Sequence, residues 1–127
     1  YKDFRLELQY MISPKGNSGV FFRSALEKNP AFTGYEMQIY DGPGQKPSIW
    51  GPTAIYEVVP PEKNVVRPHG QWNTVTITAK GPAIMIEVNG ENVIKTAQTR
   101  SMKGYIGLQN HDARAVVRFR NIRLQEL

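Results

Sequence analysis

The sequence contains no cysteine, which excludes disulfide bonds and thiolate metal sites. It contains no apolar run that approaches the ~20 residues of a membrane-spanning helix, so no membrane span is expected. We expect no signal peptide in these 127 residues, because residues 1–4 already have the pattern of folded chain. Apolar residues at helical spacing are almost absent as well. These absences leave a chain that must fold through strands and without covalent cross-links.

The composition is that of an ordinary globular domain, with 40% hydrophobic and 21% charged residues in 127 positions. This length predicts one domain over residues 1–127, large enough to bury a core without cross-links. The formal net charge is +5, and the densest basic group comprises Arg114, Arg118, Arg120 and Arg123. Such a stripe is typical of a solvated strand face, with a small anion patch as the alternative. We therefore expect no nucleic-acid partner.

Apolar and polar residues alternate with a period of two along most of the chain, which is the pattern of half-buried strands. Strands are expected at residues 4–10, 19–24, 35–41, 54–58, 74–79, 83–88, 93–94, 105–111 and 115–124. The pair Asn89-Gly90 predicts a tight hairpin turn. Short strands at this spacing, without a long helix, predict an all-β fold, a two-sheet antiparallel jelly-roll sandwich.

One predicted sheet face collects polar side chains suited to a sugar. Because residues i and i+2 of a strand share a face, Glu36 and Gln38 lie together on the side opposite the apolar residues. If four of the strands neighbour one another, that face carries Glu7, Arg23, Glu36, Gln38, Gln109 and His111. Such groups suit sugar hydroxyls, which both donate and accept hydrogen bonds. The alternative is an ordinary solvated sheet face.

Aromatic residues near these strands could stack on the apolar face of a sugar ring, namely Phe21, Tyr40, Trp50 and Tyr56. Other catalytic patterns are missing from the sequence. We find no ligand spacing characteristic of zinc or calcium, no nucleophile elbow and no glycine-rich phosphate loop. The polar face is therefore the candidate functional site.

Several short motifs follow one another in a distinctive order along the chain. They are Asn17-Ser18-Gly19-Val20-Phe21-Phe22-Arg23, Gly34-Tyr35-Glu36-Met37-Gln38-Ile39-Tyr40-Asp41, Ala54-Ile55-Tyr56, Gln71-Trp72-Asn73, Val88-Asn89-Gly90, Gly104-Tyr105-Ile106-Gly107-Leu108-Gln109-Asn110-His111 and Phe119-Arg120-Asn121-Ile122. Together they resemble the 3-keto-disaccharide hydrolase family over essentially the whole chain. The resemblance implies a concanavalin A-like jelly roll of the lectin/glucanase type, exported by bacteria to the periplasm or the exterior. Domains of that family usually begin further upstream, with a Phe-Asn-Gly-like motif and an early strand that have no counterpart here.

The resemblance also implies an activity, the cleavage of glycosides whose C3 hydroxyl has been oxidised to a ketone. The ketone acidifies the C2 proton, so a base can remove it and the glycosidic oxygen can leave C1, and added water gives net hydrolysis. We expect Glu36 and His111 to be catalytic, one as the base and the other assisting the leaving oxygen. The residues expected to bind substrate are Arg23, Gln38, Asp41, Tyr56 and Gln109.

The sequence leaves the cofactor unknown and commits no residue to a metal. A divalent metal ion would polarise the ketone, and Glu36, Asp41 and His111 would then be its ligands. The expected partner is a carbohydrate, either a keto-disaccharide or a glycan. The oligomeric state stays open.

Three alternative functions stay open. A retaining glycosidase needs two carboxylates about 5–5.5 Å apart, so Glu7 would have to approach Glu36. A noncatalytic carbohydrate-binding module would use the same fold and the same polar face. A structural interaction domain that used Arg118 and Arg120 would bind no sugar.

Overall fold

The computed structural model describes residues 1–109 and 115–127. Within these ranges the chain forms β1 (Phe4–Ile12), β2 (Asn17–Ser24), α1 (Pro30–Thr33), β3 (Tyr35–Tyr40), β4 (Asn73–Lys80), β5 (Ala83–Val88), β6 (Glu91–Ala97), β7 (Tyr105–Leu108) and β8 (Val117–Glu126). Across the described ranges, no helix has the length and apolar character that crossing a bilayer requires.

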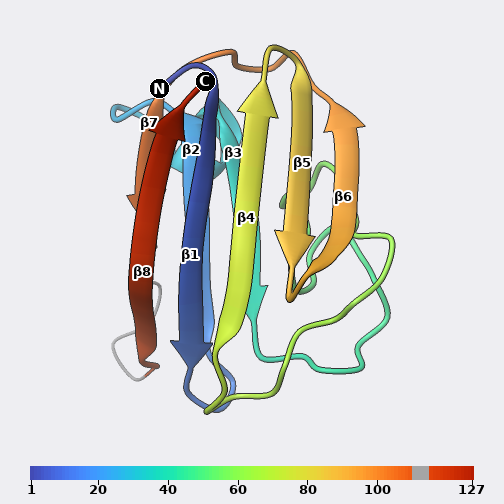
Figure 1. The fold of residues 1–127 in the computed structure, drawn as a ribbon. Coiled ribbons are helices and arrows are strands. Elements are labelled where there is room, and N and C mark those ends of the chain that lie inside the picture. Colours follow the sequence, from blue (N-terminus) through green and yellow to red (C-terminus); the bar gives the residue numbers. More distant parts are fainter. Residues whose placement is uncertain (110–114) are drawn as a thin grey trace.

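The strands form two antiparallel sheets that lie face to face (Figure 1). One sheet has the order β6-β5-β4-β1-β8, and the other has the order β3-β2-β7. The interior strand β1 pairs with β4 on one side and with the edge strand β8 on the other, so both of its neighbours come from far along the chain. The predicted all-β, two-sheet antiparallel architecture is confirmed.

The core lies between the sheets and follows the alternation read from the sequence. In β1 every second residue is buried, and the same holds for β4 and β5. Fully buried side chains from both sheets meet there, including Phe4, Leu8, Tyr10, Phe22, Tyr35, Met37, Ile39, Ile77, Ile84 and Ile86. Burying side chains of this size contributes about 1.5–3 kcal/mol each, which is what holds the two sheets together.

The strand expected at residues 54–58 is not formed. Ile55 makes only isolated bridges, to Met37 and to Val59, and the chain around it turns back on itself. Val58 and Val59 donate their backbone N–H groups to the Ile55 carbonyl, at 2.8 and 3.0 Å. An apolar run of this length fits a tight turn as well as a strand, and the local hydrogen bonds favour the turn here.

Two local sequence signals, one for a hairpin turn and one for a helix cap, correspond to what the structure contains. Asn89 and Gly90 both have positive φ angles, 52° and 83°, and connect β5 to β6 as the predicted tight hairpin. Asn29 caps the short helix α1, because its side-chain oxygen accepts the Ala31 N–H at 3.0 Å and Pro30 occupies the first turn. The sequence prediction contained no helix, although this Asn-Pro signal was available.

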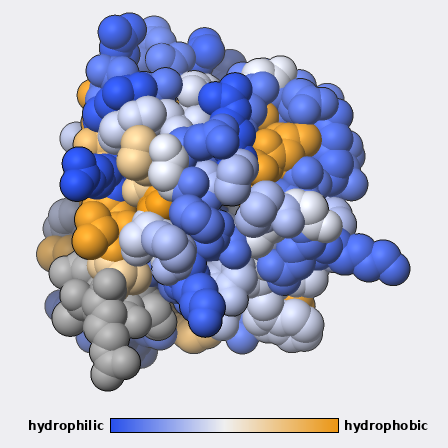
Figure 2. Space-filling model, turned by 90° about the horizontal axis from the view of Figure 1, so that it is seen from below, coloured by the Kyte–Doolittle hydropathy of each residue, from blue (hydrophilic) through white to orange (hydrophobic). Residues whose placement is uncertain are grey.

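Strands β7 and β8 lie at one edge of the sandwich, where apolar side chains reach the surface. Leu108 and Ile122 are 42% and 52% exposed. Seen from below, orange side chains interrupt the blue surface at this left-hand edge, next to the grey residues (Figure 2). Arg120 and Arg123 on β8 are exposed beside them. Positive charges along an edge strand oppose pairing with a second copy of the same edge.

Candidate functional site

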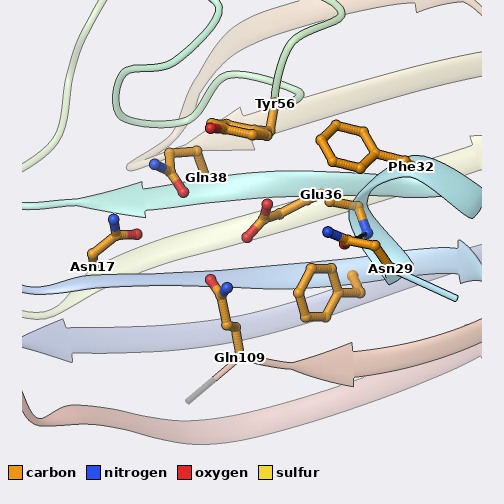
Figure 3. Close-up of a pocket in the computed structure, with 9 residues that line it drawn as sticks. Asn17, Asn29, Phe32, Glu36, Gln38, Tyr56 and Gln109 are labelled. Atoms are coloured by element: carbon orange, nitrogen blue, oxygen red, sulfur yellow. Dashed lines mark hydrogen bonds between the residues drawn. The ribbon is translucent and has the colours of Figure 1, made fainter. Parts of the chain in front are cut away.

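The outer face of the three-stranded sheet carries a cavity of about 210 Å³, which we call the Glu36 pocket (Figure 3). It is lined by Asn17, Phe21, Asn29, Ala31, Phe32, Glu36, Gln38, Tyr56 and Gln109. Pockets for drug-sized ligands measure roughly 300–1,000 Å³. The Glu36 pocket is smaller than that, so it suits a small ligand or one unit of a larger one.

The register between β2 and β3 brings the polar side chains of the pocket together. Phe21 lies opposite Glu36, and Gly19 lies opposite Gln38. Because alternate residues of a strand share a face, Glu36 and Gln38 point to the same side, away from the core. Gln109 joins them from the end of β7, where its N–H donates to the Gly19 carbonyl at 2.9 Å.

The segment after β3 covers the free edge of that strand and buries its polar side chains. Tyr56 donates its N–H to the Glu36 carbonyl at 2.8 Å, and Thr53 donates to the Gln38 carbonyl at 2.8 Å. The Gln38 side-chain amide donates to the Trp50 carbonyl at 3.3 Å. As a result, Glu36 and Gln38 are only 5% and 6% exposed, although they lie outside the core.

Three consecutive residues at the start of β2 shape the Glu36 pocket in different ways. Asn17 lines it, and the buried Ser18 hydroxyl donates to the Gln109 carbonyl at 2.5 Å. Gly19 supplies space, because a Cβ atom there would overlap the Glu36 carboxyl oxygen Oε2. The missing side chain of Gly19 therefore lets the Glu36 carboxyl lie across β2 toward Gln109 (Figure 3).

The environment of the Glu36 carboxyl in this pocket changes how the group titrates. Burial raises the pKa of its carboxyl from 4.5 to about 7. Among the described residues, no side chain donates a hydrogen bond to this carboxyl or pairs with it in an ion pair. Near neutral pH the group is therefore divided between the acid and the carboxylate, which is the state that suits a group exchanging protons.

We expect the raised pKa to make folding stability depend on pH. Below about pH 4.5 the Glu36 carboxyl is protonated in both the folded and the unfolded chain. Between pH 4.5 and about 7 only the unfolded chain releases the proton, so this carboxyl lowers stability progressively as pH rises. Urea unfolding measures the unfolding free energy of the wild type and of Glu36→Gln at each pH. As pH rises through that range, the wild type should lose stability relative to the variant. A difference that stays constant with pH would contradict the raised pKa.

Four of the sequence-predicted site residues meet in the Glu36 pocket. Glu36, Gln38, Tyr56 and Gln109 all line it, from three separate segments of the chain. His111 lies outside the described residues, so its predicted catalytic role stays a prediction. Arg23 and Asp41 do not line the pocket and are placed elsewhere.

The placement predicted for Arg23 is wrong, because the alternation of β2 breaks before this residue. The register of β2 against β7 shifts between Phe21 and Ser24, and Arg23 has a φ of 51°. Its side chain is fully buried and donates to the Lys2 carbonyl at 2.9 and 2.6 Å. It also donates to the Gly81 carbonyl at 2.6 Å and meets the Asp3 carboxylate at 3.3 Å. Arg23 therefore joins the two sheets and is unavailable to a ligand in the Glu36 pocket.

Asp41 and Glu7 are also separated from the pocket. The Asp41 carboxylate accepts the Lys15 N–H at 2.9 Å and contacts the His69 ring nitrogen Nδ1 at 3.0 Å. Partial burial raises the pKa of Asp41, but hydrogen bonds from Lys15 and His69 outweigh it and hold the pKa below its usual value. Glu7 belongs to β1 in the other sheet, where it pairs with Arg5 at 3.2 Å. Glu7 and Glu36 therefore cannot form the carboxylate pair of a retaining glycosidase.

The metal ligands considered from the sequence do not converge in the part of the chain that the structure describes. Glu36 and Asp41 stand five positions apart along one extended segment, which is about 16 Å at the usual rise per residue. Within residues 1–109 and 115–127 no group of three or more His, Asp or Glu side chains could hold a metal ion. Glu36 and Asp41 are thus not ligands of one ion.

Sequence reasoning missed four pocket residues, Asn17, Asn29, Ala31 and Phe32. The sequence analysis names Asn17 only as part of a motif, whereas it begins β2 and lines the pocket. Asn29 and Phe32 reach the pocket through α1, which the strand-based prediction did not contain. The capping signal at Asn29 and Pro30 would have located the helix, although not its position over the sheet.

Comparison with known proteins gives a match over almost the whole chain. The sequence pattern of the 3-keto-alpha-glucoside-1,2-lyase-like domain matches residues 1–125. A 3-keto-disaccharide hydrolase of Bacteroides thetaiotaomicron is 24% identical over 174 aligned positions, which include 100% of this chain. The chain spans 59% of the length of that relative.

Solved structures share the fold. A protein of Parabacteroides distasonis, provisionally described as a glycosyl hydrolase, has a TM-score of 0.87 and is 25% identical, over 100% of this chain and 79% of its own. The carbohydrate-binding module CBM66 of Bacillus subtilis has a TM-score of 0.74 at 18% identity, over 99% of this chain and 76% of its own. These similarities confirm the predicted jelly-roll fold.

Proposed function

Because this chain belongs to the 3-keto-alpha-glucoside-1,2-lyase-like domain family, we propose that it cleaves 3-keto-glycosides in the Glu36 pocket. One observation carries the proposal: a buried carboxyl with a pKa of about 7 lies in a pocket lined by amide side chains and aromatic rings. The name of the Bacteroides relative supports a keto-disaccharide as the substrate class. A group that titrates near neutral pH is well matched to general acid–base catalysis.

The proposed reaction is an elimination followed by addition of water. A base takes the proton from C2, the C1–C2 double bond forms, and the bond between C1 and the glycosidic oxygen breaks. The leaving oxygen takes a proton and departs as a free alcohol. Water then adds its hydroxyl to C1 and a proton to C2, which gives net hydrolysis. Each change in a carbon–oxygen bond is coupled to a proton transfer, and no external oxidant or reductant is consumed, so acid–base groups can assist every step.

Glu36 is the proposed base, because its carboxyl points into the pocket and is divided between its two protonation states near neutral pH (Figure 3). Asn17, Gln38 and Gln109 surround it with amide donors and acceptors that suit the ketone and the hydroxyls of the sugar. Donors aimed at the ketone oxygen would stabilise the charge that develops there as the C2 proton leaves. His111 remains the candidate for assisting the leaving oxygen.

The proposal is tested by incubating the purified chain with a 3-keto-disaccharide and with its unoxidised parent, each with and without a chelator. The expected result is release of free sugar from the keto form alone. Loss of activity with the chelator would add a metal ion to the mechanism. A folded protein that cleaves neither substrate would contradict the proposal.

A noncatalytic carbohydrate-binding module is the second candidate, favoured by the same lining of amides and aromatic rings, which binds sugar hydroxyls without any turnover. Saturable binding of unmodified glycans, together with no cleavage of a keto-sugar, would support this function over the first. Binding of neither sugar form would exclude both.

Gly19 provides a test of how Glu36 is positioned. In Gly19→Ala the new methyl group would displace the Glu36 carboxyl, while the fold should persist because a flexible side-chain end can move. We expect kcat/KM for the keto-disaccharide to fall roughly 10²-fold, the cost typical of a misplaced catalytic group. The pKa read from the pH–rate profile should also fall toward the usual glutamate value, because the displaced carboxyl is less buried.

The matched control is Gly107→Ala in the neighbouring strand β7. A Cβ atom there would meet the Phe21 ring at 3.6 Å, an ordinary van der Waals contact. Its activity and pH profile should stay close to the wild type. Equal losses in both variants would show that crowding of the sheet, and not displacement of Glu36, causes the effect.

A further inference from the structure

Two aromatic rings from separate segments stand at the rim of the Glu36 pocket. Phe32 projects from α1, and Tyr56 projects from the segment that follows β3. Their ring centroids are 6.4 Å apart, and the ring planes are inclined at 42° (Figure 3). Phe32 is 48% exposed, which leaves a large apolar surface in contact with water beside a polar pocket. We call these two side chains the aromatic rim.

Phe32 is held in place although its ring is exposed. Its helix is fastened to β2, because Ser24 Oγ donates to the Pro30 carbonyl at 2.8 Å and the Ala25 N–H donates to Thr33 Oγ1 at 3.0 Å. The neighbouring Ala31 is buried. The exposed ring is thus presented by a fixed backbone, which lowers the entropy lost when a ligand packs against it.

Tyr56 is fixed directly to the strand that carries the proposed base. Its backbone N–H donates to the Glu36 carbonyl at 2.8 Å. The distance from Glu36 to the aromatic rim is therefore set by backbone pairing. Any ligand group that packs on the rim is held at a constant place relative to the carboxyl.

The lining of the pocket is divided into two sides around Glu36. Asn17, Gln38 and Gln109 lie on one side, and Phe32 lies on the other together with Asn29, with Tyr56 above (Figure 3). The amide side suits a ring with a ketone and hydroxyls. The aromatic side offers a flat apolar surface. Such a surface binds the apolar face of a ligand ring, from which no hydroxyl group projects.

From this division we propose that the aromatic rim binds the leaving group of the substrate, and that it selects leaving groups with a flat apolar face. The inference rests on the proposed function for the reaction itself. Two sources share this chemistry: the C–H face of a second sugar ring, and the ring of an aromatic aglycone. A small leaving group such as methoxide has no such face and cannot use the rim.

The experiment compares wild type and Phe32→Ala on three 3-keto-glucosides that differ only in the leaving group, namely methyl, 4-nitrophenyl and a second glucose. Loss of the Phe32 ring should lower kcat/KM roughly 10-fold for the leaving groups that stack and leave the methyl glycoside unchanged. A loss confined to the nitrophenyl substrate assigns the rim to aromatic aglycones, and a loss confined to the disaccharide assigns it to a sugar. Phe32→Tyr should retain the wild-type values.

The control variant is Leu26→Ala, which removes a side chain that is 74% exposed and lies outside the pocket. It should leave all three substrates unaffected. Equal losses of Phe32→Ala on all three substrates, or no loss on any, would overturn the rim as a leaving-group site.

A binding experiment distinguishes failure of the proposed function from failure of the aromatic rim as a binding site. If the wild type cleaves no keto-glucoside, binding of the unoxidised disaccharide, nitrophenyl glucoside and methyl glucoside is measured by titration calorimetry. Tighter binding of either of the first two, lost in Phe32→Ala, would keep the rim as a binding site. Equal binding of all three by the wild type would overturn it.

Discussion

Replacing Glu36 by glutamine is expected to lower kcat/KM for a 3-keto-disaccharide by roughly 10²–10⁴-fold, the range that removal of a general base produces. Glutamine has nearly the same shape as the protonated carboxyl, so the contacts of β3 and the entry of substrate should be preserved. The loss should therefore appear mainly in kcat. Steady-state kinetics at neutral pH, with sugar release as the signal, measures both constants.

The control for this experiment is Glu62→Gln, which changes an exposed glutamate outside the Glu36 pocket. Its kinetics should match the wild type. The wild-type pH–rate profile should also contain an ionisation near pH 7 that disappears in Glu36→Gln. Near-normal turnover in Glu36→Gln would show that Glu36 is not the base and would leave His111 as the candidate.

Replacing Arg23 by alanine is expected to cost roughly 3–5 kcal/mol of unfolding free energy, as removal of one partner from a buried charged pair typically does. The guanidinium is fully buried and satisfies the carbonyls of Lys2 and Gly81 as well as the Asp3 carboxylate. Alanine would leave those acceptors without their donor and would open a cavity between the sheets. Urea unfolding followed by tryptophan fluorescence measures the change.

The matched control is Arg123→Ala on the exposed edge strand β8, which should change stability by no more than about 0.5 kcal/mol. Arg23→Lys should be intermediate, because an ammonium keeps the charge but cannot reproduce the fork of the guanidinium. Equal unfolding free energies for Arg23→Ala and Arg123→Ala would show that the buried contacts of Arg23 do not stabilise the fold.

The alternation of apolar and polar residues was sufficient to predict the fold class and one strand of the site. It placed Glu36 and Gln38 together because β3 is regular over its whole length. It failed for Arg23 because a single residue with positive φ reverses which side chains face the core. A reversal of this kind depends on contacts with Lys2 and Gly81, which are distant in the sequence and invisible to a local pattern.

The order of the strands was the second feature that the sequence pattern could not predict. The grouping of Glu7 with Glu36 assumed that their strands were neighbours, whereas β1 and β3 lie in different sheets. The sequence spacing of two strands does not determine whether they share a sheet, because each sheet alternates in the same way. Tyr56 was named for its aromatic ring and for its place in a motif, neither of which shows that the turn around Ile55 brings it to the Glu36 carbonyl.

The position of β1 between β4 and β8 has a consequence for how the protein is made. This strand is translated before its two partners, because β4 begins at Asn73 and β8 at Val117. At ribosomal speeds of 5–20 residues per second, β1 waits about ten seconds for its second neighbour. Its apolar row of Phe4, Leu6 and Leu8 cannot be buried in the complete sandwich during that time. Until β8 has emerged, this row is open to association with other chains, which is the hazard of pairing strands far apart in the sequence.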